Sequence, residues 1–208
     1  MKIINQSAKI LNITHNPVSL IERCGRVCYK SEDKILEDSA EKFVKGLIKR
    51  KHDSVLEHAG ATFLLVTDRG ISHEIVRHRL ASYSQESTRY CKYGDEITII
   101  DQIGIKKDTV FYSLWKSSCE SAEREYHHLL SAGCSPEWAR AVLPTCLKTE
   151  IVVTANFRQW RHMIGVRLLE NSGRAHPNIR ELFGMILDEF MKTDAAMIFS
   201  DLDKSLEV

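Results

Sequence analysis

The stretch EIVVTANFRQWRHMIGVRLL, residues 150–169, contains both kinds of element from which we expect the fold to be built. In its first part, Glu150–Ala155, β-branched residues begin at Ile151, and such residues favour an extended strand. Asn156 is a good N-cap and predicts a helix that continues through Leu169. A strand that passes directly into a helix indicates an α/β protein.

The same signals recur on both sides of this stretch. Asn16-Pro17 predicts a side-chain cap followed by proline at the first helical position. The chain shows no repeat, low-complexity tract or evident linker, so we expect a single domain over residues 1–208. Strands are predicted at Met1–Thr14, Ala61–Thr67 and Glu96–Asp101, and helices at Pro17–Tyr29, around Ile35–Ile48, and at Gly70–Arg79, Thr109–Ser131, from Pro136 and at Pro177–Lys192.

The composition is that of a globular protein. The chain has a formal net charge of +1, with 43% hydrophobic and 27% charged residues, which excludes general disorder. The near-zero charge argues against a protein that coats nucleic acid or an anionic membrane. No apolar run approaches the roughly 20 residues that cross a bilayer. The six scattered cysteines favour a reduced, cytoplasmic protein over a disulfide scaffold.

Metal and nucleophile motifs are weak. Cys24 and Cys28 lie one helical turn apart, but no second pair has matching spacing, so two small buried residues are the better interpretation. His127 and His128 are adjacent and would diverge on a helix. We therefore expect no metal. The sequence also contains no nucleophile elbow, no glycine-rich dinucleotide loop and no P-loop, so any phosphate must be held by side chains.

Two arginine-rich segments carry the chemistry. The first runs from His73 to Tyr90 and places Arg77, His78 and Arg79 before a run of hydroxyl and amide groups, which suits phosphate oxygens and a heterocycle edge. Taken alone, the arginine run also fits a solvated helix end followed by a polar loop.

The second segment is the helix after Asn156. Arg167 shares a stripe with apolar residues, where a guanidinium is costly unless it meets an anion or a polar acceptor. The alternative is an arginine whose charged end reaches past the edge of the core. Arg158, Arg161 and His162 lie together on another face of this helix.

Together these residues resemble a known family. Arg77-His78-Arg79 followed after seven residues by Ser87 resembles the signature of the flavin-dependent thymidylate synthases, the ThyX family. The resemblance continues through His52 and Glu57, the run Ala139–Pro144, Asn156-Phe157-Arg158 and Arg167, in family order. It covers nearly the whole chain.

The resemblance implies a fold, a reaction and an assembly. The fold would be a small, mostly antiparallel sheet flanked by helices. The enzyme would be an FAD-dependent methyltransferase that converts dUMP to dTMP, with 5,10-methylenetetrahydrofolate as carbon donor and FAD reduced by NADPH as hydride source. No enzyme nucleophile attacks the pyrimidine in this family, which assigns Ser87 to ligand binding. The subunits would form a homotetramer with shared active sites, without nucleic acid or membrane partners.

The resemblance also assigns residues. Arg167 would be catalytic, because a fixed cation favours negative charge on the uracil ring. Glu74 stands where some members carry glutamine, and His162 replaces an asparagine. The implied FAD contacts are Ser54, Arg77, His78, Arg79, Gln85, Asn156, Phe157, Arg158 and His162; the implied dUMP contacts are Glu74, Ile75, Val76, Arg77, Gln85, Glu86, Ser87, Thr88, Arg89, Arg140 and Arg167.

Two other functions compete with this one. A nucleic-acid-binding module could use the arginine clusters on phosphates, with Tyr83, Tyr90, Tyr93 and Trp160 available to stack on bases. A related flavoenzyme could methylate a different pyrimidine nucleotide. Flavin content and product analysis separate the three.

Overall fold

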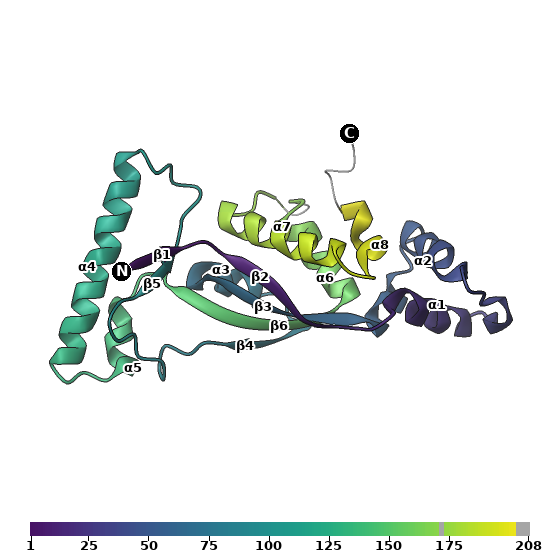
Figure 1. The fold of residues 1–208 in the computed structure, drawn as a ribbon, viewed down its shortest axis with the longest axis horizontal. Coiled ribbons are helices and arrows are strands. Elements are labelled where there is room, and N and C mark those ends of the chain that lie inside the picture. The colour runs from purple at the N-terminus through teal and green to yellow at the C-terminus, as the bar shows by residue number, and fades with distance from the viewer. Residues whose placement is uncertain (171–172, 203–208) are drawn as a thin grey trace. The chain divides into compact units, whose positions relative to one another are not determined.

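The computed structural model describes residues 1–170 and 173–202 as a mixture of helices and strands (Figure 1). The strands are β1 (Lys2–Ile4), β2 (Ser7–Ile13), β3 (Gly60–Asp68), β4 (Ala81–Gln85), β5 (Thr98–Ile100) and β6 (Lys148–Asn156). The helices are α1 (Pro17–Val27), α2 (Ser39–Lys49), α3 (Arg69–Ile75), α4 (Val110–Ser131), α5 (Pro136–Ala139), α6 (Phe157–Arg167), α7 (Pro177–Met191) and α8 (Ala196–Phe199). Short 3-10 turns lie at Glu32–Lys34, Asp53–His58, Arg140–Val142 and Ser200–Leu202.

Four strands form one sheet in the order β2-β3-β6-β4. Strands β3 and β6 run in opposite directions. The hydroxyls of Thr62 and Thr154 are 2.9 Å apart near one end, and the backbone N–H of Arg69 donates to the carbonyl of Leu147 just beyond the other. The exception is the separate pair β1–β5, which is parallel. The expected α/β class with a mostly antiparallel sheet is confirmed.

The long predicted strand at the N-terminus is interrupted. Asn5 and Gln6 separate β1 from β2, so the predicted range Met1–Thr14 is two strands. The side chain of Gln6 turns inward, where its Oε1 accepts a hydrogen bond of 2.7 Å from the Thr67 hydroxyl. A buried amide that accepts from Thr67 therefore marks the point at which the chain leaves one strand and enters the next.

Asn16 precedes α1 as predicted, but it does not cap the helix with its side chain. Its backbone has φ 46° and ψ 53°, in the left-handed region that asparagine tolerates better than most residues. The predicted proline at the first helical position is confirmed, because Pro17 begins α1. The predicted capping bond was therefore wrong.

Helix α3 ends earlier than predicted. The Asp68 carboxylate accepts from the Ile71 backbone N–H at 2.7 Å and caps its start, and the helix stops at Ile75. Arg77-His78-Arg79 therefore follows the helix, where His78 is buried and both arginines are exposed. The run predicted to belong to this helix is instead the turn after it.

Strand β4 was missed because its sequence is polar. Ala81–Gln85 carries serine, tyrosine and glutamine, without alternating apolar residues. Beyond its end, the backbone N–H of Glu86 donates to the carbonyl of Glu150 at 2.9 Å. Backbone pairing, which leaves no trace in the side-chain pattern, makes this segment extended.

The described residues fall into two compact units whose segments alternate along the chain. The first unit contains residues 1–7, 65–77 and 83–151, and the second contains residues 8–64, 78–82 and those from 152 onward. Strands β3 and β6 each have residues in both units. Residues 171–172 and 203–208, including the end of the predicted single domain, lie outside the described residues.

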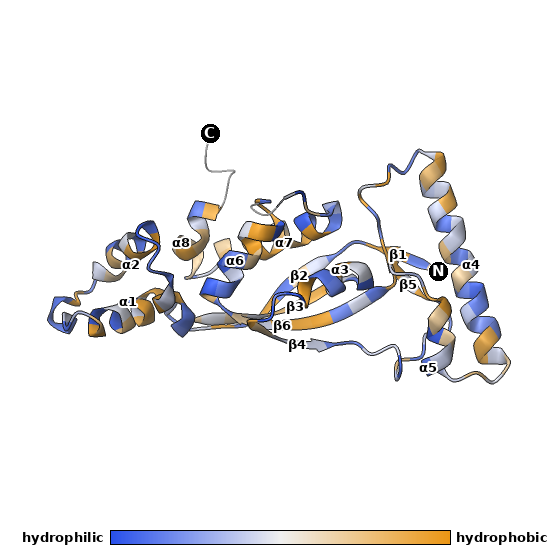
Figure 2. Ribbon diagram, turned by 180° about the vertical axis from the view of Figure 1, so that it is seen from behind, coloured by the Kyte–Doolittle hydropathy of each residue, from blue (hydrophilic) through white to orange (hydrophobic). Residues whose placement is uncertain are grey.

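An aromatic cluster forms the core of the second unit. The ring of Phe63 lies 4.9 Å from Trp160 and 5.1 Å from Phe190, centroid to centroid, and Phe190 stacks on Phe199 at 3.9 Å. Figure 2 shows the apolar residues gathered along α7, which contributes Phe190. The indole N–H of Trp160 donates to the carbonyl of Ala61 at 3.1 Å, which fixes α6 against β3.

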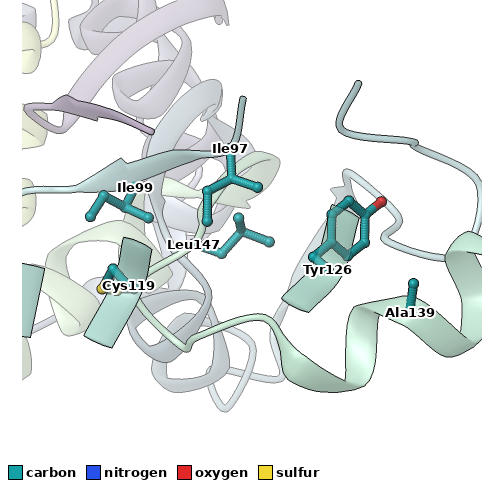
Figure 3. Close-up of a cluster of buried hydrophobic side chains, with 7 residues drawn as sticks. Ile97, Ile99, Cys119, Tyr126, Ala139 and Leu147 are labelled. Carbon is teal, nitrogen blue, oxygen red and sulfur yellow. Dashed lines mark hydrogen bonds between the residues drawn. The ribbon is translucent and has the colours of Figure 1, made fainter. Parts of the chain in front are cut away.

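The first unit has its own core around α4. Figure 3 shows the buried cluster that contains Ile97, Ile99, Cys119, Tyr126, Ala139 and Leu147, all nearly inaccessible. The Cys119 sulfur lies 3.4 Å from the sulfur of Cys146, and all six cysteines are free thiols. No described helix is both long and apolar enough to cross a membrane.

Replacing Phe63 by alanine tests the aromatic core. Phe63 is fully buried, so we expect the variant to lose about 3–5 kcal/mol of unfolding free energy, measured by urea denaturation. Phe111→Ala is the matched control, because that ring is 70% exposed, and it should change stability by no more than about 0.5 kcal/mol. Equal losses in the two variants would contradict the assignment of the core.

Candidate functional site

A cavity of about 980 Å³ opens along α6 in the second unit, near the upper end of the range for cofactor sites. Asn156, Arg158 and His162, three of the residues assigned to FAD by resemblance, line it. Its remaining walls are Asp53, Glu57, Leu80, Gln159, Arg161, Gly165, Val166 and Leu202. The structure therefore gathers the predicted flavin-binding face of α6 around one hollow.

The local sequence explains why α6 presents these residues. Asn156 accepts from the Gln159 backbone N–H at 2.9 Å and so fixes the start of the helix, as predicted. Trp160, Met163 and Ile164 are fully buried on the opposite side. Because the helical repeat separates the two sets, the polar side chains face the cavity. The expectation that Arg158, Arg161 and His162 share a face is confirmed.

The two arginines on this wall are held differently. Arg158 donates to the Glu57 carboxylate at 2.6 Å, and both side chains are about half exposed. Arg161 makes two bonds to the Asp201 carboxylate, at 2.6 and 2.7 Å, and a further one to the carbonyl of Ile198. Exposed ion pairs are weak, so Arg158 can change partner at low cost, whereas Arg161 is fixed by its network.

Ser54 lies in a neighbouring cavity of about 370 Å³. Asp53 and Arg158 line both hollows, so the two are contiguous at these residues. Tyr29 and His52 also line the smaller one. The predicted cofactor contact Ser54 is thus placed next to the other predicted contacts on α6.

Arg167 meets His78 at the end of α6. Its Nε donates to Nε2 of His78 at 3.0 Å, so His78 accepts there and carries its proton on Nδ1. Burial of the ring, reinforced by the Arg167 cation and then by His162, lowers the pKa of His78 from 6.5 to about 4. Arg167 thus has a neutral imidazole as one acceptor, which agrees with the interpretation that an arginine on this apolar stripe meets a polar acceptor.

The predicted substrate residue Gln85 belongs to the first unit and is anchored there. Its Nε2 donates to the hydroxyl of Ser72 at 2.8 Å and to that of Thr149 at 3.1 Å. Arg69 donates to the same Thr149 hydroxyl at 3.3 Å. Both donor hydrogens of the amide are used, so Gln85 offers its carbonyl oxygen to a ligand rather than its N–H groups.

Both carboxylate oxygens of Glu86 also accept hydrogen bonds within the protein. The Tyr93 hydroxyl donates to one carboxylate oxygen at 2.7 Å, and the Lys148 ammonium donates to the other at 3.1 Å. Burial and the bond to Glu86 raise the pKa of Tyr93. The predicted substrate contact Glu86 is therefore bound to other side chains of the protein. These bonds hold the end of β4 and the start of the turn that follows.

That turn carries the remaining predicted substrate groups. The Ser87 hydroxyl accepts from the Arg89 backbone N–H at 3.3 Å, and Arg140 donates to the Thr88 hydroxyl at 3.3 Å. The Arg89 side chain pairs with Glu137 of α5 at 2.8 Å. Two guanidinium groups thus converge on one short turn, which suits a phosphate or the oxygens of a pyrimidine.

Several predicted contacts are placed elsewhere. The side chains of Ile75 and Phe157 are fully buried, and the Phe157 ring lies 5.8 Å from Phe190, so both pack in cores rather than along a cavity. Val76 and Glu74 are half-buried around the end of α3. Ile75 and Phe157 belong to the family motif, but their side chains pack in the cores that support the site.

The predicted residues divide between the units. Ser54, His78, Arg79, Asn156, Phe157, Arg158, His162 and Arg167 are in the second unit; Glu74, Ile75, Val76, Arg77, Gln85, Glu86, Ser87, Thr88, Arg89 and Arg140 are in the first. The expected FAD contacts are thus concentrated in one unit and the expected dUMP contacts in the other. Arg77, Gln85 and Arg167 are the exceptions.

Four partners in these sites were not predicted as site residues. Glu137 and Lys148 pair with Arg89 and Glu86, and Asp201 holds Arg161. Each lies far along the chain from its partner, and no spacing in the sequence links them. Glu57, the partner of Arg158, belongs to the motif order but has no ligand assigned to it by the resemblance. Within residues 1–170 and 173–202, no group of three metal-ligating side chains comes together.

Comparison with known proteins gives the family. The family model described as "Thymidylate synthase complementing protein" matches residues 9–194. The flavin-dependent thymidylate synthase of Pyrococcus furiosus is 35% identical over 195 residues, which cover 89% of this chain and 79% of that protein. That of Corynebacterium efficiens is 33% identical over 205 residues, with 90% and 80% covered.

A solved structure has the same fold. The UMP/dUMP methylase PolB from Streptomyces cacaoi, bound with 5-Br dUMP, matches with a TM-score of 0.79 over 97% of both chains, at 21% identity. The matched sequence motifs, the α6 cavity and these relatives agree, and the chain belongs to the flavin-dependent thymidylate synthase family.

The low pKa of His78 predicts how stability depends on pH. The folded protein keeps His78 neutral down to about pH 4, whereas the unfolded chain takes up this proton near 6.5, so the unfolded state binds more protons between these values. The unfolding free energy should therefore fall as pH decreases through this window, by about 3 kcal/mol from this group.

Urea denaturation between pH 7 and 4 checks this in three proteins. His78→Asn should flatten the pH dependence of the unfolding free energy. His73→Asn, at an exposed histidine on α3, should leave it unchanged. Identical slopes for the original protein and His78→Asn, or an NMR midpoint for His78 above pH 6, would show that the ring is not held neutral.

Proposed function

We propose that this protein is a flavin-dependent thymidylate synthase that methylates dUMP to dTMP. The single observation that carries the proposal is the α6 wall, where the family motif residues Asn156, Arg158 and His162 line one cavity and Arg167 meets His78 beside them on the same helix. FAD would supply the hydride, after reduction by NADPH, and 5,10-methylenetetrahydrofolate would supply the carbon.

The residues of the cavity suit a flavin dinucleotide. Arg158 carries a half-exposed charge that can turn from Glu57 to a phosphate oxygen. The carboxylates of Asp53 and Glu57 can accept from sugar hydroxyls, and the amide of Asn156 can donate to a ring or phosphate oxygen. Arg79, exposed next to His78 in the same unit, adds a further cation.

The turn after β4 would hold dUMP. Arg89 and Arg140 would take the phosphate, while the Ser87 and Thr88 hydroxyls and the Gln85 carbonyl would orient the nucleotide. Ser87 would position rather than attack, because its hydroxyl accepts from the Arg89 backbone and an unactivated hydroxyl is a poor nucleophile.

Arg167 would act through its charge. The Nε of this guanidinium donates to a neutral imidazole, and that contact does not itself neutralise the positive charge. A fixed cation in a half-buried position stabilises negative charge that develops on a uracil oxygen or nitrogen. His78 would be a positioning residue, because it orients this cation.

The assembly completes the proposal. Two units that alternate along the chain would work as one domain over residues 1–208, and four subunits would share their active sites. The enzyme would work in the cytoplasm with dUMP, folate and NADPH as its partners and without nucleic acid. PolB, which shares the fold, is a methylase of UMP and dUMP, so product analysis should include both nucleotides.

The flavin is tested by the spectrum of the purified protein. We expect a yellow protein that releases FAD on denaturation, and whose reduced flavin is reoxidised without oxygen only when dUMP and methylenetetrahydrofolate are both present. Colourless protein that cannot be reconstituted with FAD would overturn the proposal. Formation of 5-methyl-UMP from UMP, without dTMP from dUMP, would replace dUMP as the substrate.

Replacing Arg167 by alanine tests the electrostatic role. We expect dTMP formation to fall by about 10²–10³-fold while FAD content per subunit is unchanged, because an interaction that strengthens in the transition state is lost. Arg180→Ala is the control: that arginine is half exposed on α7 and pairs with Glu170. Unchanged turnover in Arg167→Ala would remove this residue from catalysis.

A further inference from the structure

A second charged groove lies between α1 and α2, away from the residues that the family motif marks. Its volume is about 580 Å³, and its walls carry Arg26, Lys34, Lys42 and Arg50 against one carboxylate, Asp38. Nothing in the proposed chemistry uses these four cations. A concave surface with this excess of positive charge is suited to an anion.

The groove is elongated along α2. Lys42, Gly46 and Arg50 lie one helical turn apart on the same stripe, and eight residues of helix span about 12 Å. Gly46 forms part of the lining, and the Arg50 guanidinium lies beside it, because a Cβ atom at position 46 would be 3.2 Å from an Arg50 guanidinium nitrogen. Lys34, on the turn before α2, adds a cation from a second element.

Arg26 forms the fixed end of this arrangement. Its guanidinium donates to the buried Glu22 carboxylate at 2.8 Å and lies 4.3 Å over the ring of Phe43. Glu22 also accepts from the Ser39 hydroxyl at 2.8 Å, which ties α1 to α2. Arg26 thus shares its charge with Glu22.

The other three cations are differently placed. Lys34, Lys42 and Arg50 are exposed, and the structure of residues 1–170 and 173–202 gives none of their side chains an ion pair. They are therefore the groups in the groove that can bind an external anion without giving up a carboxylate partner.

One layer of side chains separates this groove from the cofactor side of the second unit. Gly25 lines the cavity that contains Ser54, and Phe43 lines the basic groove. A Cβ atom at position 25 would lie 2.7 Å from the Phe43 ring, so the two residues are in direct contact. A ligand held at the Ser54 cavity is thus close enough to extend a chain around this wall.

We propose that the basic groove binds the γ-linked glutamate chain of the folate co-substrate. This inference rests on the proposed function. Folates carry one glutamate or a chain of them, and each added residue contributes a carboxylate at a regular spacing. Separate cations contributed by the turn at Lys34 and by α2 match a ligand that carries several carboxylates. A single phosphate would instead favour cations that converge on one point.

Binding of folate to the flavin-loaded enzyme tests the groove directly. Isothermal titration with pentaglutamyl folic acid and with its monoglutamate should give a Kd about tenfold lower for the pentaglutamate, as three exposed charge pairs of two- to threefold each would produce. In Lys42→Glu/Arg50→Glu this preference should disappear, while the affinity for the monoglutamate stays unchanged.

The matched control reverses two charges on the same helix outside the groove. Lys45 and Lys49 are exposed on α2 and do not line it, so Lys45→Glu/Lys49→Glu should keep the preference for pentaglutamate. Raising the salt concentration should weaken pentaglutamate binding in the original protein and in the control variant alike.

Other outcomes would overturn the inference. Equal affinities for the two folates in the original protein would show that the groove does not bind the glutamate chain. An equal loss of the pentaglutamate preference in both double variants would show the same. Weaker binding of NADPH in the groove variant, with folate binding unchanged, would assign the groove to the phosphates of the dinucleotide. If the protein forms no dTMP but still prefers the pentaglutamate, the proposed reaction is rejected and the proposed binding role of the groove stands.

Discussion

The contact between Arg167 and His78 is the constraint on which the site depends. A guanidinium at the end of an apolar stripe needs a partner, and a carboxylate would satisfy it while neutralising its charge. The neutral imidazole of His78 accepts the hydrogen bond from Nε, and that contact does not itself neutralise the charge. The cost is that His78 must stay unprotonated, which its burial and the neighbouring cation ensure. The position of His78 between two exposed arginines, buried while they are not, follows from this requirement.

Secondary structure could be predicted where the residues that determine it lie within one short segment. The strand Lys148–Asn156 and the cap at Asn156 follow from β-branched residues and an amide oxygen within a few positions. Strand β4 could not be predicted, because its extended form comes from backbone pairing with a distant strand. The side chain of Asn16 failed as a cap because its backbone adopts a left-handed conformation that no local pattern indicates.

The candidate site shows the same division. The α6 face could be predicted from helical spacing, since Arg158 and His162 are one turn apart and the cavity lies on their side. The anchoring of Gln85 and Glu86 could not, because their partners Thr149 and Lys148 lie more than sixty positions along the chain. The family motif therefore contains two kinds of residue. Some face a ligand and others hold the backbone in position, and the sequence alone does not tell them apart.

Several arginines of the candidate site are held by carboxylates, in a chain that is nearly neutral. Carboxylates from elsewhere in the chain pair with Arg158, Arg89 and Arg161. An incoming phosphate at Arg158 or Arg89 must exchange with Glu57 or Glu137, and its affinity is then the difference between two interactions rather than the strength of one. Such exchange disfavours weakly charged ligands, because only a group with more negative charge or better geometry than a carboxylate gains by it. The paired arginines therefore favour a phosphate-bearing nucleotide over an uncharged nucleoside, even though the chain as a whole is nearly neutral.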